Sequence, residues 1–489
     1  VPGVPDVEVS SDLAFQRLQS ASNPQYVATQ VVEGRCREGS LFGTSSSDSD
    51  TGPDSNASFR PNDEGGVAVL ASGTIGPYDF VVIQPDASFE APGDVAVDWL
   101  ADEGYDVVPP EGDADAVAAM LGTYFQGGMN LLAFRLTKGN DAGTIRPVRI
   151  TYESEQPMIP IRPTAVAAND DMGVLVWVVG ADRAVPINYR SLELNEALID
   201  WRQSGANYNQ VVIAAANEAG GQGFVTERAG PASTYENVIL APGERDQWES
   251  IANSVEALPT STVVTQSVGL LRTWDGFEDV ALRHLPGRLD GSGLFICEGC
   301  NQLTSEDLDT AAFVRDLEAE VVNPMLETED LLLSRPYVTR LYTTLSAPEM
   351  DRDPLFDFNP DLEDASNVHN ATWVIECKRE LFLGEAPSRF ELEDGRVVRL
   401  EPGAPWPFIP GDSEAPPANA LVVQLSTSGQ GEVVEDNRPA IDALLSDHNN
   451  GVIGGGCAVG YGDPPITPGG LLLIALVLGI SRRHRSQTG

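Results

Sequence analysis

Histidine and the usual catalytic signatures are scarce in this chain. Only four histidines occur among 489 residues, and neither a Gly-x-Ser-x-Gly nor a His-Glu-x-x-His motif is present. Phosphate-loop and dinucleotide-binding patterns are also missing, because the glycine-rich stretch 451–456 does not join a strand to a helix. These absences argue against the common nucleophilic, zinc-dependent and nucleotide-dependent enzymes.

Positive charge is also in short supply. The chain carries 30 basic and 73 acidic side chains, which gives a formal net charge of −43. Such a surface repels phosphate, so nucleic acid is excluded as an expected partner. The acidity is typical of a well-hydrated ectodomain. With 42% hydrophobic residues, the chain can still bury a full core.

The C-terminal segment combines a lone cysteine, Cys457, with a short apolar run and a basic cluster. Fifteen residues, Ile466 to Ile480, would form a helix about 22 Å long, whereas the hydrocarbon core of a bilayer is roughly 30 Å thick. A temporary processing signal therefore fits this length at least as well as a permanent span. Arginines that flank such a segment stay cytoplasmic, which places the body of the protein outside. The residues assigned to the membrane segment and its stop are Leu471, Leu472, Leu473, Ile474, Leu476, Val477, Leu478, Ile480, Arg482, Arg483 and Arg485.

This order of parts resembles the myxobacterial-type C-terminal sorting tail. The resemblance covers residues 457–489 and implies that Cys457 is lipidated or processed. It also implies that a sorting or processing peptidase acts on the tail, and that the membrane is a partner. The expected location is the outer surface of the cell envelope. Export also leads us to expect a signal peptide upstream of Val1.

The chain has five cysteines, an odd number. Thiols outside the cell tend to pair, and Cys457 is the natural one left over. The other four are Cys36, Cys297, Cys300 and Cys377. Cys297 could close on Cys300 and Cys36 on Cys377, but three connectivities are open. The Cys-x-x-Cys pair could instead be a redox centre or half of a zinc site.

The densest group of carboxylates lies between Glu349 and Asp364. Acidic side chains at alternate positions can converge on calcium through a turn, and two carboxylates about 5–10 Å apart can act as a glycosidase pair. A solvated acidic loop is the third interpretation. The calcium candidates are Asp351, Asp353, Asp357, Asn359 and Asp361.

Hydrophobic periodicity predicts an α+β fold with mixed or antiparallel sheets and packed helices. Two strands are expected across Val67–Ile83, and a hairpin is expected around Asp394-Gly395. The pattern also predicts helices, and the longest of them begins at a Thr-Ser-Glu-Asp N-cap. The expected helices cover 94–102, 113–124, 192–203, 206–219, 242–257 and 304–322.

Four segments follow from composition. Residues 1–230 are an N-terminal α+β lobe with a disordered Ser/Asp/Gly-rich insertion at 39–66. Residues 231–400 form a helix-rich C-terminal lobe. A Pro-, Gly- and acid-rich segment at 401–456, with short strand-like pieces such as Ala420–Leu425, is expected to include a flexible stalk. The short hydrophobic helix of the tail at 457–489 follows it.

Several phrases in the body resemble the bacterial domain of unknown function 2330 family. They include Gly76-Pro-Tyr-Asp-Phe, Asp98-Trp-Leu, Ile145-Arg-Pro-Val and Pro157-Met-Ile-Pro-Ile-Arg. The likeness is clearest over residues 1–210 and extends to about 400. No activity, cofactor or catalytic residue is attached to this family, so the resemblance implies an envelope setting and no mechanism.

Three functions remain open. The first is a non-enzymatic surface protein that binds a ligand or serves a structural role. The second is a secreted polymer hydrolase that uses a carboxylate pair. The third is a thiol–disulfide protein that uses Cys297 and Cys300. The scarcity of histidine and of nucleophile motifs favours the first.

Overall fold

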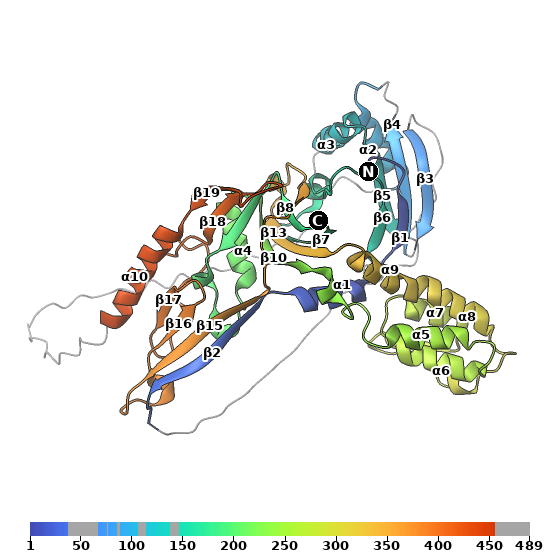
Figure 1. Ribbon diagram of the computed structural model, residues 1–489. Coiled ribbons are helices and arrows are strands. Elements are labelled where there is room, and N and C mark those ends of the chain that lie inside the picture. The colour runs from blue at the N-terminus through green and yellow to red at the C-terminus, as the bar shows by residue number, and fades with distance from the viewer. Residues whose placement is uncertain (38–66, 76, 86–88, 106–113, 137–145, 455–489) are drawn as a thin grey trace, which may run out of the picture.

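A six-stranded sheet runs through the middle of the molecule (Figure 1). The computed structural model describes residues 1–37, 67–75, 77–85, 89–105, 114–136 and 146–454. In the sheet the strand order is β19-β18-β9-β10-β13-β7, and only the β9–β10 pair is parallel. Parallel neighbours need a crossover, and helix α4 lies between these two strands in the chain. The elements are β7 (Met172–Gly180), β9 (Arg190–Leu194), α4 (Tyr208–Glu218), β10 (Gly223–Pro231), β13 (Tyr337–Leu345), β18 (Asn419–Gln424) and β19 (Glu432–Asp436).

A second sheet of four strands stands beside the central one. Its order is β17-β16-β15-β2, and the long strands β2 and β15 run parallel over ten paired residues. A hydrophobic core that includes Trp201, Phe390 and Trp406 joins this sheet to α4 and the central sheet. The elements are β2 (Gln25–Gly34), β15 (Val368–Cys377), β16 (Ser388–Leu392) and β17 (Val397–Leu400).

The N-terminal part adds a small α+β layer at the upper right of Figure 1. Strands β3, β4 and β5 form an antiparallel sheet, and helices α2 and α3 pack closely together against it. Val97, Trp99 and Leu100 of α2 are buried. The predicted strand pair and both predicted helices are therefore confirmed. The elements are β1 (Asp6–Val9), β3 (Val67–Ile75), β4 (Tyr78–Pro85), α2 (Pro92–Asp102), α3 (Ala114–Gln126), β5 (Leu131–Leu136) and β6 (Val148–Thr151), with β1 paired to β6.

A helical subdomain lies between β10 and β13 in the chain and projects at the lower right of Figure 1. Its core includes Trp248, Trp274 and Phe313. The helix predicted from Thr304 begins later, at Thr310, because Asp309 accepts the hydrogen bond that caps it. The elements of the subdomain are α5 (Glu244–Asn253), α6 (Thr260–Leu271), α7 (Phe277–His284), β11 (Arg288–Leu289), β12 (Phe295–Ile296), α8 (Thr310–Leu317) and α9 (Asn323–Leu333). Helix α1 (Asp12–Ser22), from the start of the chain, adds Ala14 and Leu18 to the same core.

Two other segments differ from the sequence analysis. Residues 192–203 were expected as a helix, but they hold strand β9 and two short 3-10 turns, because β9 pairs with strands on both sides. The stretch from Glu401 to Gly454 was expected to include a flexible stalk. It adds β18, β19 and helix α10 (Arg438–Gly454) to the fold, and it buries Trp406, Ile441 and Leu445.

The fold is α+β, as predicted. The hairpin at Asp394-Gly395 is also present, between β16 and β17. The boundary expected near residue 230 falls at the end of β10, yet strands from both sides of it share the central sheet. The insertion 39–66 lies outside the described residues.

Candidate functional site

The parallel strands β2 and β15 of the second sheet bring two ring side chains together. Tyr26 of β2 and His369 of β15 are register partners in the parallel ladder. Their rings stack with centroids 4.7 Å apart and planes inclined by 17°. Trp201 meets the Tyr26 ring edge-on at 5.1 Å. The ladder and the neighbouring rings therefore hold both side chains in place.

A carboxylate orients the imidazole. Nδ1 of His369 lies 2.6 Å from Oε1 of Glu196, which sits in the 3-10 turn that follows β9. Asn195 caps that turn by accepting a hydrogen bond from the backbone N–H of Ala197. The other carboxylate oxygen, Oε2 of Glu196, makes no hydrogen bond within the described part of the chain, and the side chain keeps 21% of its surface exposed.

A buried ion pair lies next to this dyad. Glu227 of β10 and Arg340 of β13 pair with side chains only 2% and 4% exposed. Tyr208 of α4 donates its hydroxyl proton to Oε1 of Glu227 over 2.6 Å. Buried charge is tolerated when it is paired and hydrogen-bonded, and these contacts satisfy the carboxylate.

These groups line a cavity of about 600 Å³ between the two sheets. Tyr26, Tyr208, His369, Glu196 and Glu227 lie on its wall. A volume in this range suits a small molecule. Leucine and valine side chains from the strands of the central sheet supply its apolar surface: Leu192, Val225, Leu421, Val423 and Val433.

Acidic side chains outnumber basic ones around the cavity. Arg183 is the one basic side chain other than histidine among the lining residues. The acidic lining residues are Glu193, Glu196, Glu227, Glu393 and Asp394. Two of these carboxylates have arginine partners, Glu227 with Arg340 and Asp394 with Arg396. The surroundings of the cavity remain negative after these pairs are counted.

Both tyrosines of the wall stay protonated at neutral pH. Burial raises the pKa of Tyr26, and the nearby carboxylates of Glu196 and Glu227 raise it further. Burial and the carboxylate of Glu227 raise the pKa of Tyr208 in the same way. Tyr26 is only 5% exposed, and its hydroxyl makes no hydrogen bond among the described residues. It is a polar group on the cavity wall with an open bonding position.

The arrangement suits binding better than nucleophilic catalysis. A catalytic base of this kind needs a nucleophile within hydrogen-bond reach. Within the described residues His369 makes no hydrogen bond to a serine, threonine or cysteine side chain. The dyad therefore holds a polar imidazole on the wall without an activated nucleophile beside it.

The five calcium candidates are spread over separate contacts. Asp353 accepts hydrogen bonds from the Tyr124 hydroxyl and from the backbone of Arg162, and Asp351 accepts one from Gln222. The remaining three candidates lie in or just after strand β14 (Phe356–Asn359), which is paired with β8 (Arg183–Pro186). Asp357 accepts from the backbone of Phe358, while Asn359 and Asp361 bond to the backbone of the segment that follows β18. Across the ranges that the structure describes, no three His, Cys, Asp or Glu side chains gather around a metal position.

The candidate cysteines form two bridges. Cys36 pairs with Cys377, and Cys297 pairs with Cys300. The first bridge closes the end of the β2–β15 ladder, where Gly34 faces Cys377. It lies on the strands that carry Tyr26 and His369, at the opposite end from those two rings.

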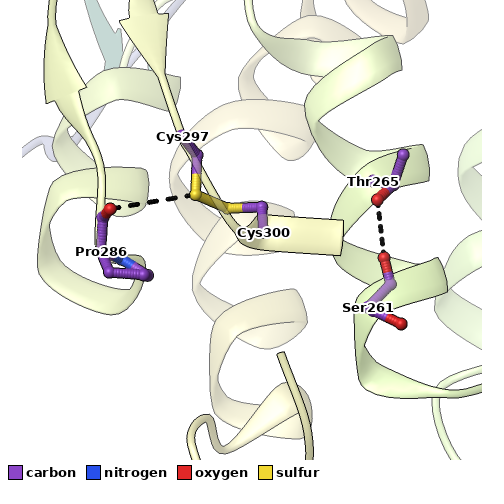
Figure 2. The surroundings of a disulfide bond; sticks show 5 residues. All are labelled: Ser261, Thr265, Pro286, Cys297 and Cys300. Carbon is purple, nitrogen blue, oxygen red and sulfur yellow. Dashed lines mark hydrogen bonds between the residues drawn. A yellow bond between two sulfur atoms is a disulfide. The ribbon is translucent and has the colours of Figure 1, made fainter. Parts of the chain in front are cut away.

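The second bridge belongs to the helical subdomain (Figure 2). Cys300 is buried and begins a three-residue 3-10 turn, while Cys297 is partly buried after β12. The carbonyl oxygen of Pro286 lies 4.0 Å from the Cys297 sulfur. Reactive Cys-x-x-Cys pairs place a cysteine at the N-terminus of a helix that lowers its pKa. A 3-10 turn of three residues offers little of that effect, so the bridge fits a structural role.

The tail residues lie outside the described part of the chain. This holds for Cys457, for the apolar run from Leu471 to Ile480 and for Arg482, Arg483 and Arg485. Among the helices of the described residues, none has the length and apolar character that a membrane crossing requires.

Sequence reasoning missed the residues of the cavity. His369 is one of only four histidines and belongs to no local motif, and Glu196 lies 173 positions away from it. Tyr26 and Glu227 carry no local signal. The pairing of β2 with β15 assembles the wall, and no local sequence motif predicts that pairing.

Comparison with known proteins finds one family model that matches the first part of the chain. Residues 1–235 match the model of a family described as "Uncharacterized protein conserved in bacteria (DUF2330)". This confirms the resemblance over those residues, and the match ends just after β10. No curated protein and no solved structure matches the chain.

Proposed function

For a chain whose first 235 residues match this bacterial family, we propose an exported protein of the cell envelope that acts as a ligand-binding module. The cavity between the two sheets is its binding site. The tail holds the protein at the outer surface. The proposed role is non-enzymatic, because the described residues of the cavity offer an oriented imidazole and carboxylates without an activated nucleophile.

The bridge between Cys36 and Cys377 carries this proposal. It joins two cysteines 341 positions apart and fastens the strands that bear Tyr26 and His369. Disulfides persist in oxidising compartments outside the cytosol. A covalent link at the far end of the β2–β15 ladder is therefore an argument for export, and it restrains the two strands that form the binding wall.

The tail supplies the anchoring part of the proposal. Cys457 would carry lipid or mark the processing position, with the apolar run and the arginines acting as a sorting signal read by a peptidase. The strongly acidic body then stands in the medium outside the membrane. No nucleic acid takes part, because phosphate would be repelled.

Cell fractionation with mass spectrometry tests the proposal. We expect the intact protein in the envelope fraction, with Cys36 and Cys377 joined in the non-reduced sample. Replacing Cys457 by serine should release the protein or leave its tail unprocessed, whereas Cys297→Ser should leave its location unchanged. Recovery of the native chain from the cytosol with free thiols at all four cysteines of the body would overturn the proposal.

A further inference from the structure

We infer that the cavity between the two sheets binds a small organic cation that bears an ammonium or guanidinium group. This inference rests on the proposed binding function and names the class of ligand. Two acceptor positions on the cavity wall, on Glu196 and Tyr26, carry it, because neither has a protein partner among the described residues.

The first open position is a carboxylate oxygen. Oε1 of Glu196 is bonded to His369, which leaves Oε2 without a hydrogen bond in the described part of the chain. Glu196 lines the cavity and is only partly exposed. A partly desolvated carboxylate forms a stronger charge-assisted hydrogen bond than an exposed one. A ligand N–H carrying positive charge fits this oxygen.

The second open position is the hydroxyl of Tyr26. This side chain is more than nine-tenths buried and lines the same cavity. Burial and the two neighbouring carboxylates keep it in the neutral form, so its oxygen retains lone pairs that can accept an N–H. Glu196 and Glu227 act electrostatically on this hydroxyl, which places it near two negative charges. An anionic ligand would be repelled at this point.

The remaining charges around the cavity favour the same class. Glu193 and Glu393 line the cavity and are exposed to solvent. Arg183 is the basic exception on this wall: its Nη1 donates to the backbone carbonyl of Glu363, and its buried Nε makes no hydrogen bond within the described residues. A cation is therefore favoured both at the wall and at the rim. The apolar strand residues of the central sheet can cover the hydrocarbon part of such a ligand.

Calorimetric titration of the full chain in about 150 mM salt tests the inference. The probes are agmatine, which carries an ammonium and a guanidinium group, and glucose as an uncharged comparison. We expect agmatine to bind saturably at one site and glucose not to bind. Salt at this level screens the exposed acids, so a strongly negative surface alone would not give saturation at one equivalent.

Variants locate the binding. Glu196→Gln should weaken agmatine binding about tenfold or more, because a hydrogen bond to a charged group is lost. Tyr26→Phe should weaken it roughly three- to tenfold. The control is Glu249→Gln, an exposed acid on α5 in the helical subdomain, which should bind as the parent does. Unfolding midpoints within a degree or two of the parent show that each variant is folded.

Three results would overturn the inference. Equal affinity in Glu196→Gln, Glu249→Gln and the parent would show that agmatine binds elsewhere on the acidic surface. Glucose binding that is lost in Tyr26→Phe would overturn the cationic class while leaving the cavity as the site of a binding module. Binding of neither probe by the folded full chain would overturn the inference, while the proposed location would still stand or fall on the fractionation result.

Discussion

Arg340 is the residue at which several layers of the molecule meet. From β13 its guanidinium pairs with Glu227. It also donates hydrogen bonds of 2.7 Å to the side chains of Ser22 and Asn23 at the end of α1. Its charged group also lies 5.3 Å from the centre of the Trp177 ring. Strand β2 starts two residues after Asn23, so these contacts fix the entry of the strand that presents Tyr26. Arg340 does not line the cavity. Its contacts therefore position the cavity wall without touching a bound ligand.

Glu376 is the residue whose ionisation we expect to be felt in stability. Burial acts to raise its pKa, but hydrogen bonds from Arg389 and Arg399 outweigh burial and lower it below the ordinary 4.5. Both arginines donate to the same oxygen, Oε1. Arg389 also bonds Glu33 of β2, which extends the contact across the second sheet.

The variant Glu376→Gln should lower the unfolding temperature at neutral pH. Because the folded-state pKa is depressed, the stabilisation is fully present above pH 4.5 and is lost as the pH falls through the folded value. The difference between parent and variant should therefore shrink steadily below pH 4.5. Unfolding temperatures measured from pH 3 to 8 check this, with Glu249→Gln as the control. A difference that grows towards acid pH would contradict the assignment.

At the scale of elements, one glycine sets the distance between two helices. A β-carbon built on Gly93 of α2 would lie 1.8 Å from the backbone oxygen of Ala118 in α3. The neighbouring helical glycine, Gly122 of α3, has nothing closer than 3.9 Å in the same position. The close packing of α2 on α3 thus depends on Gly93 and leaves Gly122 free to change.

We expect Gly93→Ala to push the two helices apart and to destabilise the N-terminal layer by roughly 1–3 kcal/mol. Gly122→Ala should be neutral or stabilising by up to about 1 kcal/mol, because alanine is the better helix former. Hydrogen exchange of the amides in α2 and α3 measures both effects within this layer. Faster exchange in Gly122→Ala than in Gly93→Ala would show that the contact has been misjudged.

Elements with a local cause were predictable from the sequence. The β3–β4 pair follows from its alternating pattern and helices α2 and α3 from their apolar faces, and the predicted ranges agree with the structure to within a few residues. Strand β9 was missed because its partners β10 and β18 lie elsewhere in the chain. Strand β18 lies where the strand-like piece Ala420–Leu425 was expected. The docking of the rest of 401–454 was missed, because a composition rich in Pro, Gly and acid hid the few apolar side chains that pack on a distant core.

The candidate site could not be predicted from local sequence patterns. Its wall needs Tyr26 beside His369 and Glu196 beside both, and each contact crosses more than 160 positions of sequence. Single-sequence patterns report what lies within one helix or strand, whereas this site exists only after two sheets have assembled. The two disulfides were open to anticipation because cysteines are few, and an odd count already sets one apart.

At the scale of the whole molecule, the bridge between Cys36 and Cys377 links the start of the chain to its last third. Closing a loop of this length removes a large amount of entropy from the unfolded chain. The bridge between Cys297 and Cys300 closes a loop of only a few residues and therefore removes much less. The two bridges in one molecule therefore offer a matched comparison of a long loop with a short one.

The double variant Cys36→Ala/Cys377→Ala should be less stable by roughly 2–5 kcal/mol, and Cys297→Ala/Cys300→Ala by about 2 kcal/mol or less. Urea unfolding of both, against the oxidised parent, measures the difference. Agmatine binding should weaken in the first variant only, because β2 and β15, which carry Tyr26 and His369, lose the bond that joins the opposite end of their ladder. If the short-loop variant were the less stable of the two, loop closure would not be the source of the effect. If the long-loop variant bound agmatine as tightly as the parent, the β2–β15 ladder alone would suffice to preform the cavity.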